Sequence, residues 1–198
     1  GGRAVFVQNG NLMAAEGDWR ARIASLASIP MTLDGRISFQ VENAMAAAAA
    51  AWSLGIPFEM IRLGLETFSV DPRVAPGRFN IMTFRGATIL VDYGHNTSAL
   101  TALIEAIGKL PHERRLCVYT AAGDRRDEDI IRQAELIAHG FDEVMIYEDA
   151  CTRGRADGEV VRLMRTGLAR GVRLQKVRET RGELNAIETM LRMLQAGD

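Results

Sequence analysis

Several residue types are scarce in this sequence, and each scarcity excludes a class of protein. The 198 residues include two cysteines, five prolines and three histidines, and aromatic residues make up 6%. Cys117 lies in an apolar run and Cys151 in a polar loop, so neither a disulfide framework nor a zinc site is expected. No apolar run approaches the length of a membrane span and no signal peptide is recognisable, which favours a cytoplasmic location.

A dominant charge sign is also missing. Lysine and arginine (24) balance aspartate and glutamate (25), which gives a formal net charge of −1. Such a chain has no overall field that attracts nucleic acid or a membrane surface, so neither is an expected partner. Hydrophobic residues make up 47% of the chain, which is enough for a substantial core.

Two nucleotide-binding motifs are absent from the sequence. There is no G-x-x-x-x-G-K-[ST] phosphate loop, because Gly108-Lys109 lies at an expected helix end and lacks the preceding glycine. There is also no G-x-G-x-x-G motif between a strand and a helix, which argues against a dinucleotide site.

Apolar strands and amphipathic helices alternate from residue 79 onward. This alternation predicts an α/β fold with a mostly parallel sheet and helices on both faces. The tight turn Arg85-Gly86 makes strand 79–84 antiparallel to the strand that follows it. Strands are expected at 79–84, 87–91, 116–121, 144–147 and 172–177, and helices after Asn96, at Asp127, at Asp157 and after a capping box at 180–183.

The first third of the chain has a different pattern. Short strands are expected at 4–8, 11–15 and 23–26, with a hairpin turn at Asn9-Gly10. An alanine-rich helix at 41–54 is closed by Gly55, and a second helix runs from Pro57 to about residue 67. Residues 69–75 end at Pro76 and are interpreted as a linker, so we expect one domain at 1–73 and another at 74–198.

The two ends of the sequence indicate a piece of a longer protein. Gly1-Gly2 has no initiator methionine, and the helix that finishes at 194–198 stops where another strand would begin. We therefore expect the second domain to lack its last strand.

Four polar residues follow the apolar run 87–91 and precede a helix: Asp92, Tyr93, His95 and Asn96. In open α/β sheets ligands bind at this edge, where helix N-termini favour phosphate. A carboxylate accepts ribose hydroxyls, an aromatic ring lies against a base, and histidine and amide groups donate to phosphate. The alternative interpretation is structural, with Asp92 ending the strand and Asn96 capping the helix.

The segment Pro76-Gly-Arg-Phe79, a short hairpin and then Val91-Asp-Tyr-Gly-His-Asn96 resemble the start of the C-terminal domain of the Mur ligases. The superfamily includes folylpolyglutamate synthetases, which have a similar Asp-x-x-His-Asn pattern. Residues 123–130 and 153–159 look like those of the cyanophycin synthetase family, whose members build an aspartate–arginine polymer. The resemblance covers most of the chain.

This resemblance implies a Rossmann-like C-terminal domain, preceded by the end of an α/β central domain. It also implies an ATP- and Mg²⁺-dependent ligase that adds arginine to the side-chain carboxylate of polyaspartate through an acyl phosphate. Asp92 would contact the ribose, with Tyr93 and Asn96 also on the nucleotide, and Arg78 and His95 would act in catalysis. Asn43 would contact adenine, although Phe39-Gln40 replaces the superfamily's His-Asn pair before it.

Two charged loops are the expected amino-acid site, because both follow strands and an arginine substrate needs carboxylates and a cation. The alternative is that they are merely solvated loops. The candidate residues are Asp124, Arg125, Asp127 and Asp129 in the first loop, and Glu148, Asp149, Arg153 and Arg155 in the second.

The expected partners are the remainder of the same polypeptide, which would carry the phosphate loop, and the amino-acid and polymer substrates. The isolated chain is therefore expected to be inactive. No metal-ligating residue is assigned, and homo-oligomerisation is left open. The alternatives are a cell-wall (UDP-MurNAc peptide) or folylpolyglutamate ligase, a non-catalytic nucleotide-binding module, and a structural or interaction domain without a ligand.

Overall fold

The computed structural model describes residues 2–198. The chain divides into two compact units, one ending at Asn80 and the other running from Ile81 to Asp198. Each unit has its own buried core. Among the described residues, no helix is both long and apolar enough to cross a membrane.

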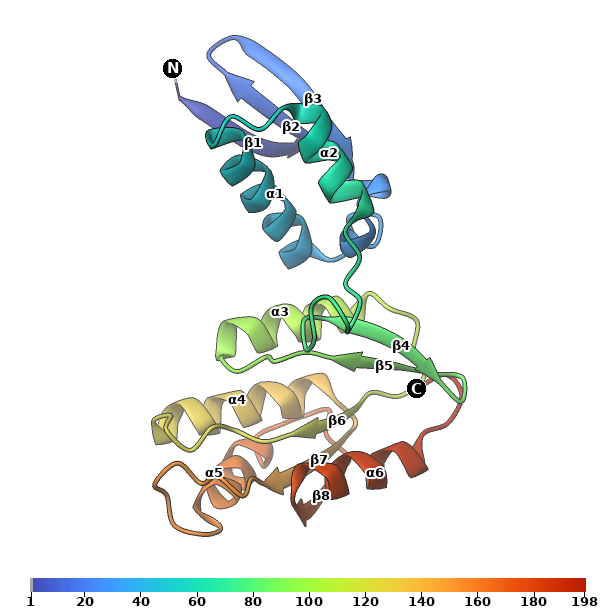
Figure 1. Cartoon of the computed structure of the whole chain (residues 1–198). Coiled ribbons are helices and arrows are strands. Elements are labelled where there is room, and N and C mark those ends of the chain that lie inside the picture. The colour runs from blue at the N-terminus through green and yellow to red at the C-terminus, as the bar shows by residue number, and fades with distance from the viewer. Residues whose placement is uncertain (1) are drawn as a thin grey trace. The chain divides into compact units, whose positions relative to one another are not determined.

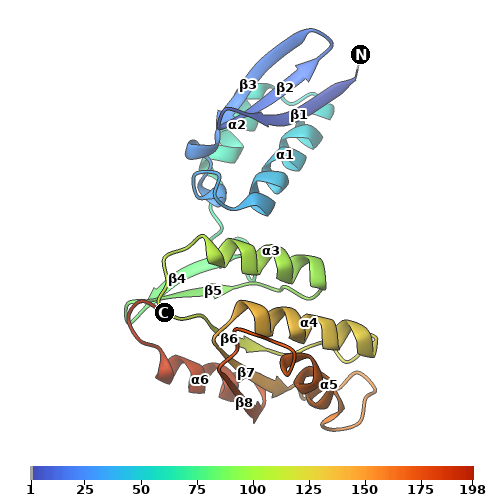
Figure 2. The same cartoon turned by 180° about the vertical axis from the view of Figure 1, so that it is seen from behind.

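The first unit packs two helices against an antiparallel sheet (Figure 2). The strands are β1 (Arg3–Gln8), β2 (Asn11–Glu16) and β3 (Trp19–Ser25), followed by the 3-10 turns η1 (Leu26–Ser28) and η2 (Pro30–Thr32). The helices are α1 (Ser38–Ser53) and α2 (Phe58–Thr67). The hairpin turn at Asn9-Gly10 has φ values of 50° and 72°, as that dipeptide predicts.

Alanines let α1 approach the sheet closely. Ala44 and Ala48 are fully buried and lie in one cluster with Leu12 and Ile23 of the sheet. The helix ends at Ser53, and Gly55 adopts φ 80° just beyond it, as predicted. The rest of this core comprises Ala14, Ala24, Leu26, Ile29, Val41, Ile61 and Leu65.

The second unit confirms the α/β class. Strands β4 (Asn80–Phe84) and β5 (Ala87–Val91) form a hairpin whose arrows point in opposite directions in Figure 1. Strands β6 (Leu116–Tyr119), β7 (Glu143–Glu148) and β8 (Lys176–Arg181) form a parallel sheet in that order. The helices are α3 (Thr97–Gly108), α4 (Asp127–Gly140), α5 (Glu159–Leu168) and α6 (Glu183–Met193).

The sheet of the second unit is interrupted between β5 and β6. Within residues 2–198, backbone pairing does not join the hairpin to the parallel sheet. The last two residues bridge the interval: Thr88 donates to the Asp198 carbonyl (2.9 Å), and Glu113 donates to the Gly197 carbonyl (2.7 Å). Figure 1 shows the C-terminus beside the hairpin. The Asp198 carboxylate also accepts two hydrogen bonds from Arg114 (2.8 and 2.6 Å).

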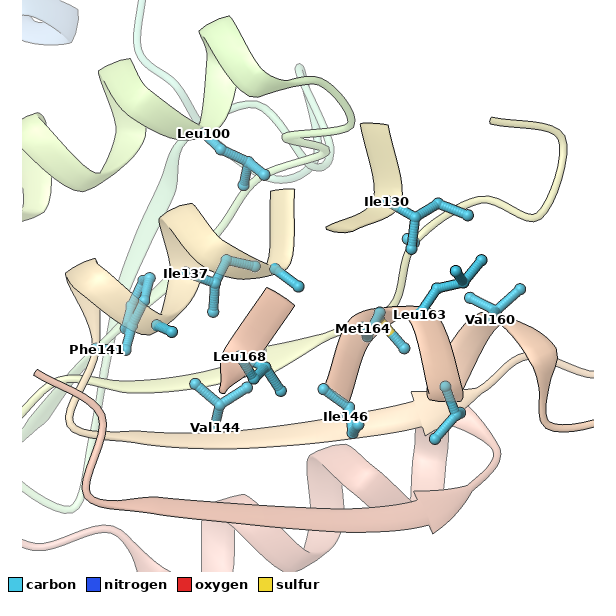
Figure 3. Close-up of a cluster of buried hydrophobic side chains, with 14 residues drawn as sticks. Leu100, Ile130, Ile137, Phe141, Val144, Ile146, Val160, Leu163, Met164 and Leu168 are labelled. Atoms are coloured by element: carbon cyan, nitrogen blue, oxygen red, sulfur yellow. The ribbon is translucent and has the colours of Figure 1, made fainter. Parts of the chain in front are cut away.

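Strand β7 lies at the centre of the second core. Val144 and Ile146 face α4 and α5, where they pack with Ile137 and Met164 (Figure 3). The opposite face of the strand, with Met145 and Tyr147, packs against α6. All four residues from Val144 to Tyr147 are buried, so β7 lies between two helical layers, as the apolar run at 144–147 predicts.

Two local predictions near the end of the chain are wrong. The last strand begins at Lys176 and not at Val172, which is 89% exposed. β8 is an edge strand rich in charge, so hydrophobicity does not mark it, and its pairing with β7 sets its limits. The capping box does not form, because Thr180 lies inside β8 and the residue that caps α6 is Gly182.

Asp142 fixes the start of β7. Its carboxylate accepts hydrogen bonds from the Arg115 backbone N–H (2.8 Å) and from Arg173 (2.9 Å), and its side chain is 17% exposed. Burial works against the charged form, but these bonds and the two guanidinium groups hold the pKa of Asp142 below its usual value. Asp142 therefore stabilises the fold as a carboxylate.

We expect Asp142→Asn to lower the free energy of unfolding at pH 7 by about 1–3 kcal/mol, because it leaves buried donors poorly satisfied. A depressed pKa contributes stability above the unfolded value near about 3.9, and that stability is lost as pH falls through the folded pKa. Urea denaturation should therefore give a smaller difference from wild type below about pH 4 than at pH 7.

The matched control is Asp157→Asn, because the Asp157 side chain is 79% exposed and lies 3.9 Å from its partner Arg181. This substitution should change stability little at either pH. An equal loss at both pH values in Asp142→Asn would contradict a role for the charge.

Candidate functional site

The residues after β5 form a compact turn at the carboxyl end of that strand. Asp92 Oδ1 accepts a hydrogen bond from the Gly94 N–H (2.8 Å), which holds the chain as it leaves the strand. Tyr93 is 59% exposed, and its ring centroid lies 4.9 Å from that of His95. The turn therefore presents two neighbouring rings and a carboxylate in front of α3.

Asn96 is the N-cap of α3. Its backbone is extended (φ −145°, ψ 163°), and its Oδ1 accepts from the Ala99 N–H at 2.8 Å. The structural interpretation of Asn96 is therefore correct. A role of Asn96 in nucleotide binding stays a proposal. The capped N-terminus of α3 still carries a partial positive charge, which favours phosphate.

Arg153 joins the loop after β7 to the loop after β6. Its Nη1 donates to Asp124 Oδ2 (3.1 Å), although the two residues are 29 apart in sequence. The hydrogen bond to Asp124 and the charge of its carboxylate raise the pKa of Arg153. Both side chains of the pair are about half exposed, at 46% and 51%.

Arg155 is held much more firmly than Arg153. Its side chain is 15% exposed and contacts Asp127 (2.8 Å) and Glu159 (2.7 Å). It also donates to two backbone carbonyls of the preceding loop, at Gly123 and Arg125 (both 2.6 Å). Arg125 thus contributes a backbone group here, which its residue type did not predict.

The other acidic candidates have partners near them in sequence, and Glu148 also lies 3.9 Å from Arg181 at the end of β8. Asp129 accepts two hydrogen bonds from Arg126 (2.9 and 3.0 Å). Glu148 accepts from the Gly158 N–H, just before α5. Asp149 accepts from the Cys151 N–H (2.8 Å) in a short turn. Two of the predicted acidic residues pair across the two loops: Asp124 with the half-exposed Arg153, and Asp127 with the shielded Arg155.

Two candidates, Asn43 and Arg78, belong to the first unit. Asn43 is exposed in the first turns of α1 and donates to Gln40 Oε1 (3.0 Å), and Gln40 itself is 4% exposed. The sequence pattern did not predict this pair of amides.

Arg78 lies in a turn that Asn80 organises. Asn80 is 1% exposed, accepts from the Gly77 N–H (2.7 Å), and donates to the carbonyls of Val70 (3.1 Å) and Ala75 (3.0 Å). The asparagine three residues after glycine in a proline-rich segment is the signal that could have predicted this turn. Arg78 therefore stands on an ordered loop.

Metal ligands do not gather at this edge. In the part of the chain that the structure describes, no three histidine, cysteine or acidic side chains are grouped so as to hold a metal ion. One surface hollow lies along α5 and β8, and another lies beside Arg114 and Asp142. Tyr93, Asp124 and Arg153 are each about half exposed, so the strand-end loops that carry them are open to solvent.

Comparison with known proteins agrees with this arrangement of strand-end loops. Residues 77–198 match the family described as "Mur ligase, glutamate ligase domain". The chain belongs to the Mur ligase family. This finding accounts for the antiparallel hairpin, the parallel sheet and the motif at 91–96 as one inherited domain.

Among curated proteins, the chain is similar to a cyanophycin synthetase of Nostoc sp. (strain PCC 7120 / SAG 25.82 / UTEX 2576). The two are 38% identical over 168 residues, which is 85% of this chain and 19% of the relative. A UDP-N-acetylmuramoyl-L-alanyl-D-glutamate--2,6-diaminopimelate ligase of Chelativorans sp. (strain BNC1) is 31% identical over 81% of this chain and 31% of the relative. The chain thus spans about a fifth of the cyanophycin synthetase.

Among solved structures, E. coli FolC in complex with DHPP and ADP has a TM-score of 0.68 and 18% identity. The match covers 98% of this chain and 41% of that one. At this level of identity the likeness supports the fold, and it extends over both units of the chain.

The cap of α3 gives a testable prediction. Asn96→Ala should lower stability by about 1 kcal/mol, because the Ala99 N–H loses its partner. Asn96→Asp should stay close to wild type, because a carboxylate oxygen caps equally well and complements the helix dipole. Thermal or urea denaturation measures both variants, and an equal loss in the two would contradict the cap as the source of stability.

Proposed function

We propose that the chain is part of an ATP-dependent ligase of the cyanophycin synthetase type. The ligase would add arginine to the side-chain carboxylate of a polyaspartate chain through an acyl phosphate. The observation that carries this proposal is the pairing of Asp124 with Arg153, from the loops that follow β6 and β7. The 38% identity to a cyanophycin synthetase supports the choice of substrate.

The loop after β5 would bind the nucleotide. A carboxylate accepts several hydrogen bonds at once, so the bond from Gly94 to Asp92 is compatible with ribose contacts. Tyr93 and His95 offer exposed rings, one for the base and one for the phosphates. Asn96 and the N-terminus of α3 would face phosphate, and Asn43 and Arg78 of the first unit would contact adenine and the phosphates.

The loops after β6 and β7 would bind the amino acid. The Arg153 guanidinium rests on Asp124 through one hydrogen bond of 3.1 Å, half exposed to water. The Arg153 guanidinium thus makes the same kind of contact with Asp124 that the guanidinium of an arginine substrate would make. The guanidinium of an incoming arginine would displace Arg153 and bind Asp124. The displaced Arg153 would then bind the α-carboxylate of the substrate.

When the amino group attacks the acyl phosphate, the carbonyl oxygen of the activated acid gains a negative charge. Arg78 is a guanidinium, which suits the oxygens of a phosphoryl group during its transfer. The acidic residues of this chain do not fit a Mg²⁺ site on their own, since they pair with N–H groups and arginines. We propose that the phosphate loop and the metal ligands belong to another part of the same polypeptide.

The nucleotide half of the proposal is tested at Asp92 in the longer ligase polypeptide. Asp92→Ala should raise the KM for ATP about tenfold, which corresponds to about 1.4 kcal/mol, and should change the other two KM values less. A ribose contact serves ground state and transition state alike, so kcat should change less than KM. Asp92→Asn is the matched variant, since its amide oxygen still accepts from Gly94.

Steady-state kinetics with ATP varied at fixed arginine gives the required constants. A large fall in kcat at an unchanged KM for ATP would remove Asp92 from the ribose. Wild-type values of the KM for ATP in both Asp92→Ala and Asp92→Asn would also rule out the ribose contact.

The amino-acid half is tested by neutralising acids one at a time. Asp124→Asn should raise the KM for arginine at least about tenfold, because a guanidinium loses its carboxylate partner. Asp129→Asn is the control, since Asp129 already binds Arg126 and should leave this KM within about twofold. Kinetics are measured with arginine varied at saturating ATP.

The alternative function has its own outcome in the same assay. The similarity to a diaminopimelate ligase makes that amino acid the competing substrate. Faster turnover with diaminopimelate than with arginine would overturn the arginine assignment but leave the ligase class intact. Nucleotide binding with no amino-acid ligation at all would favour a non-catalytic module.

A further inference from the structure

We propose that Arg155 is a positioning residue: it fixes the two loops that carry Asp124 and Arg153 and does not itself bind the amino acid. This inference rests on the proposed function, in which Asp124 and Arg153 are the contacts to arginine. The contacts of Arg155 can be tested separately, without any substrate.

The guanidinium of Arg155 is occupied by the protein itself. Nε donates to the Gly123 carbonyl and Nη2 to the Arg125 carbonyl, both at 2.6 Å. Nη1 contacts Glu159 Oε1 at 2.7 Å and Asp127 Oδ1 at 2.8 Å. A guanidinium has five N–H donors, and these four contacts use most of them. With a side chain only 15% exposed, Arg155 is badly placed to take up a substrate carboxylate.

The two carbonyls bound by Arg155 flank Asp124 on either side. Holding the backbone at Gly123 and Arg125 fixes the position from which the Asp124 side chain extends. The ion pair with Asp127 also connects Arg155 to the first turn of α4. Arg155 therefore contacts the loop after β6 at two backbone carbonyls and α4 at its first residue.

The two loops also touch directly through their backbones. A Cβ atom at Gly123 would lie 2.2 Å from the Thr152 carbonyl oxygen, so only glycine fits there. Within the loop after β7, the Arg155 backbone N–H donates to the same Thr152 carbonyl (3.2 Å). The intervening Arg153 has φ 51°, a left-handed conformation held between these fixed points.

Arginine is required for this role because of its shape. Its planar fork reaches two carbonyls and two carboxylates at once, whereas the lysine ammonium is a compact point charge on a flexible stem. Arg155→Lys therefore keeps the positive charge but removes most of the guanidinium contacts that connect the two loops. Arg126→Lys is the matched control, because Arg126 lies beside the same loop but its side chain is 72% exposed.

The first experiment is amide hydrogen exchange on this chain without substrate. In Arg155→Lys, residues 122–127 and 152–156 should exchange at least about tenfold faster, with β6 and β7 unchanged. Arg126→Lys should match wild type. Unchanged exchange in both loops of Arg155→Lys would overturn the proposal, and so would faster exchange throughout the unit, which indicates general destabilisation.

The second experiment is a double-mutant cycle on the KM for arginine in the longer ligase polypeptide. Arg155→Lys should raise this KM about tenfold and leave the KM for ATP within about twofold. Adding Asp124→Asn should then have little further effect, because Arg155 acts through the position of Asp124. Additive effects of the two substitutions would make Arg155 an independent substrate contact and overturn the proposal. A wild-type enzyme that ligates no arginine would refute the proposed function, while the exchange data would still decide whether Arg155 fixes the loops.

Discussion

The parallel pairing of β6 with β7 is the constraint on which the candidate site depends. Their register runs from Leu116 opposite Glu143 to Tyr119 opposite Ile146, so both strands end at the same edge. The loops that leave there are close enough for the Gly123 and Thr152 backbones to touch. Val144 and Ile146, almost fully buried between helices and sheet, hold β7 in that register. Asp124 and Arg153, 29 residues apart, meet for this reason.

The sequence predicted the elements whose burial leaves a hydrophobic pattern. Strand β5 runs from Ala87 to Val91 as predicted, because an apolar run bounded by Arg85-Gly86 and Asp92 has few alternatives. The strand at Lys176–Arg181 was misplaced, since an edge strand with charged side chains has no such pattern. The strand was predicted to begin at Val172 because that residue is apolar, but Val172 is exposed in the preceding loop. Tertiary pairing, not local propensity, sets where this strand begins.

At the site, the sequence identified which loops carry charge but not which charges meet. Asp129 and Arg126 are neighbours on one helix start, and their pairing is a local matter. Glu148 instead satisfies the N–H of Gly158 ahead of α5, a contact that depends on how the loop folds back. The two carbonyls that bind Arg155 carry no side-chain signal at all. Backbone acceptors are the part of a site that residue types cannot predict.

The two arginines of the loop after β7 illustrate how solvent exposure separates exchangeable contacts from permanent ones. Water competes with the half-exposed pair of Arg153 and Asp124, so a second guanidinium could replace the first at little net loss. Arg155 is shielded and satisfies two backbone carbonyls, which would be left without partners if it moved. The proposed amino-acid site would use both kinds of contact. In this proposal, Arg155 keeps the loop in place, so that the Asp124 carboxylate can exchange Arg153 for a substrate guanidinium without the loop having to reorder.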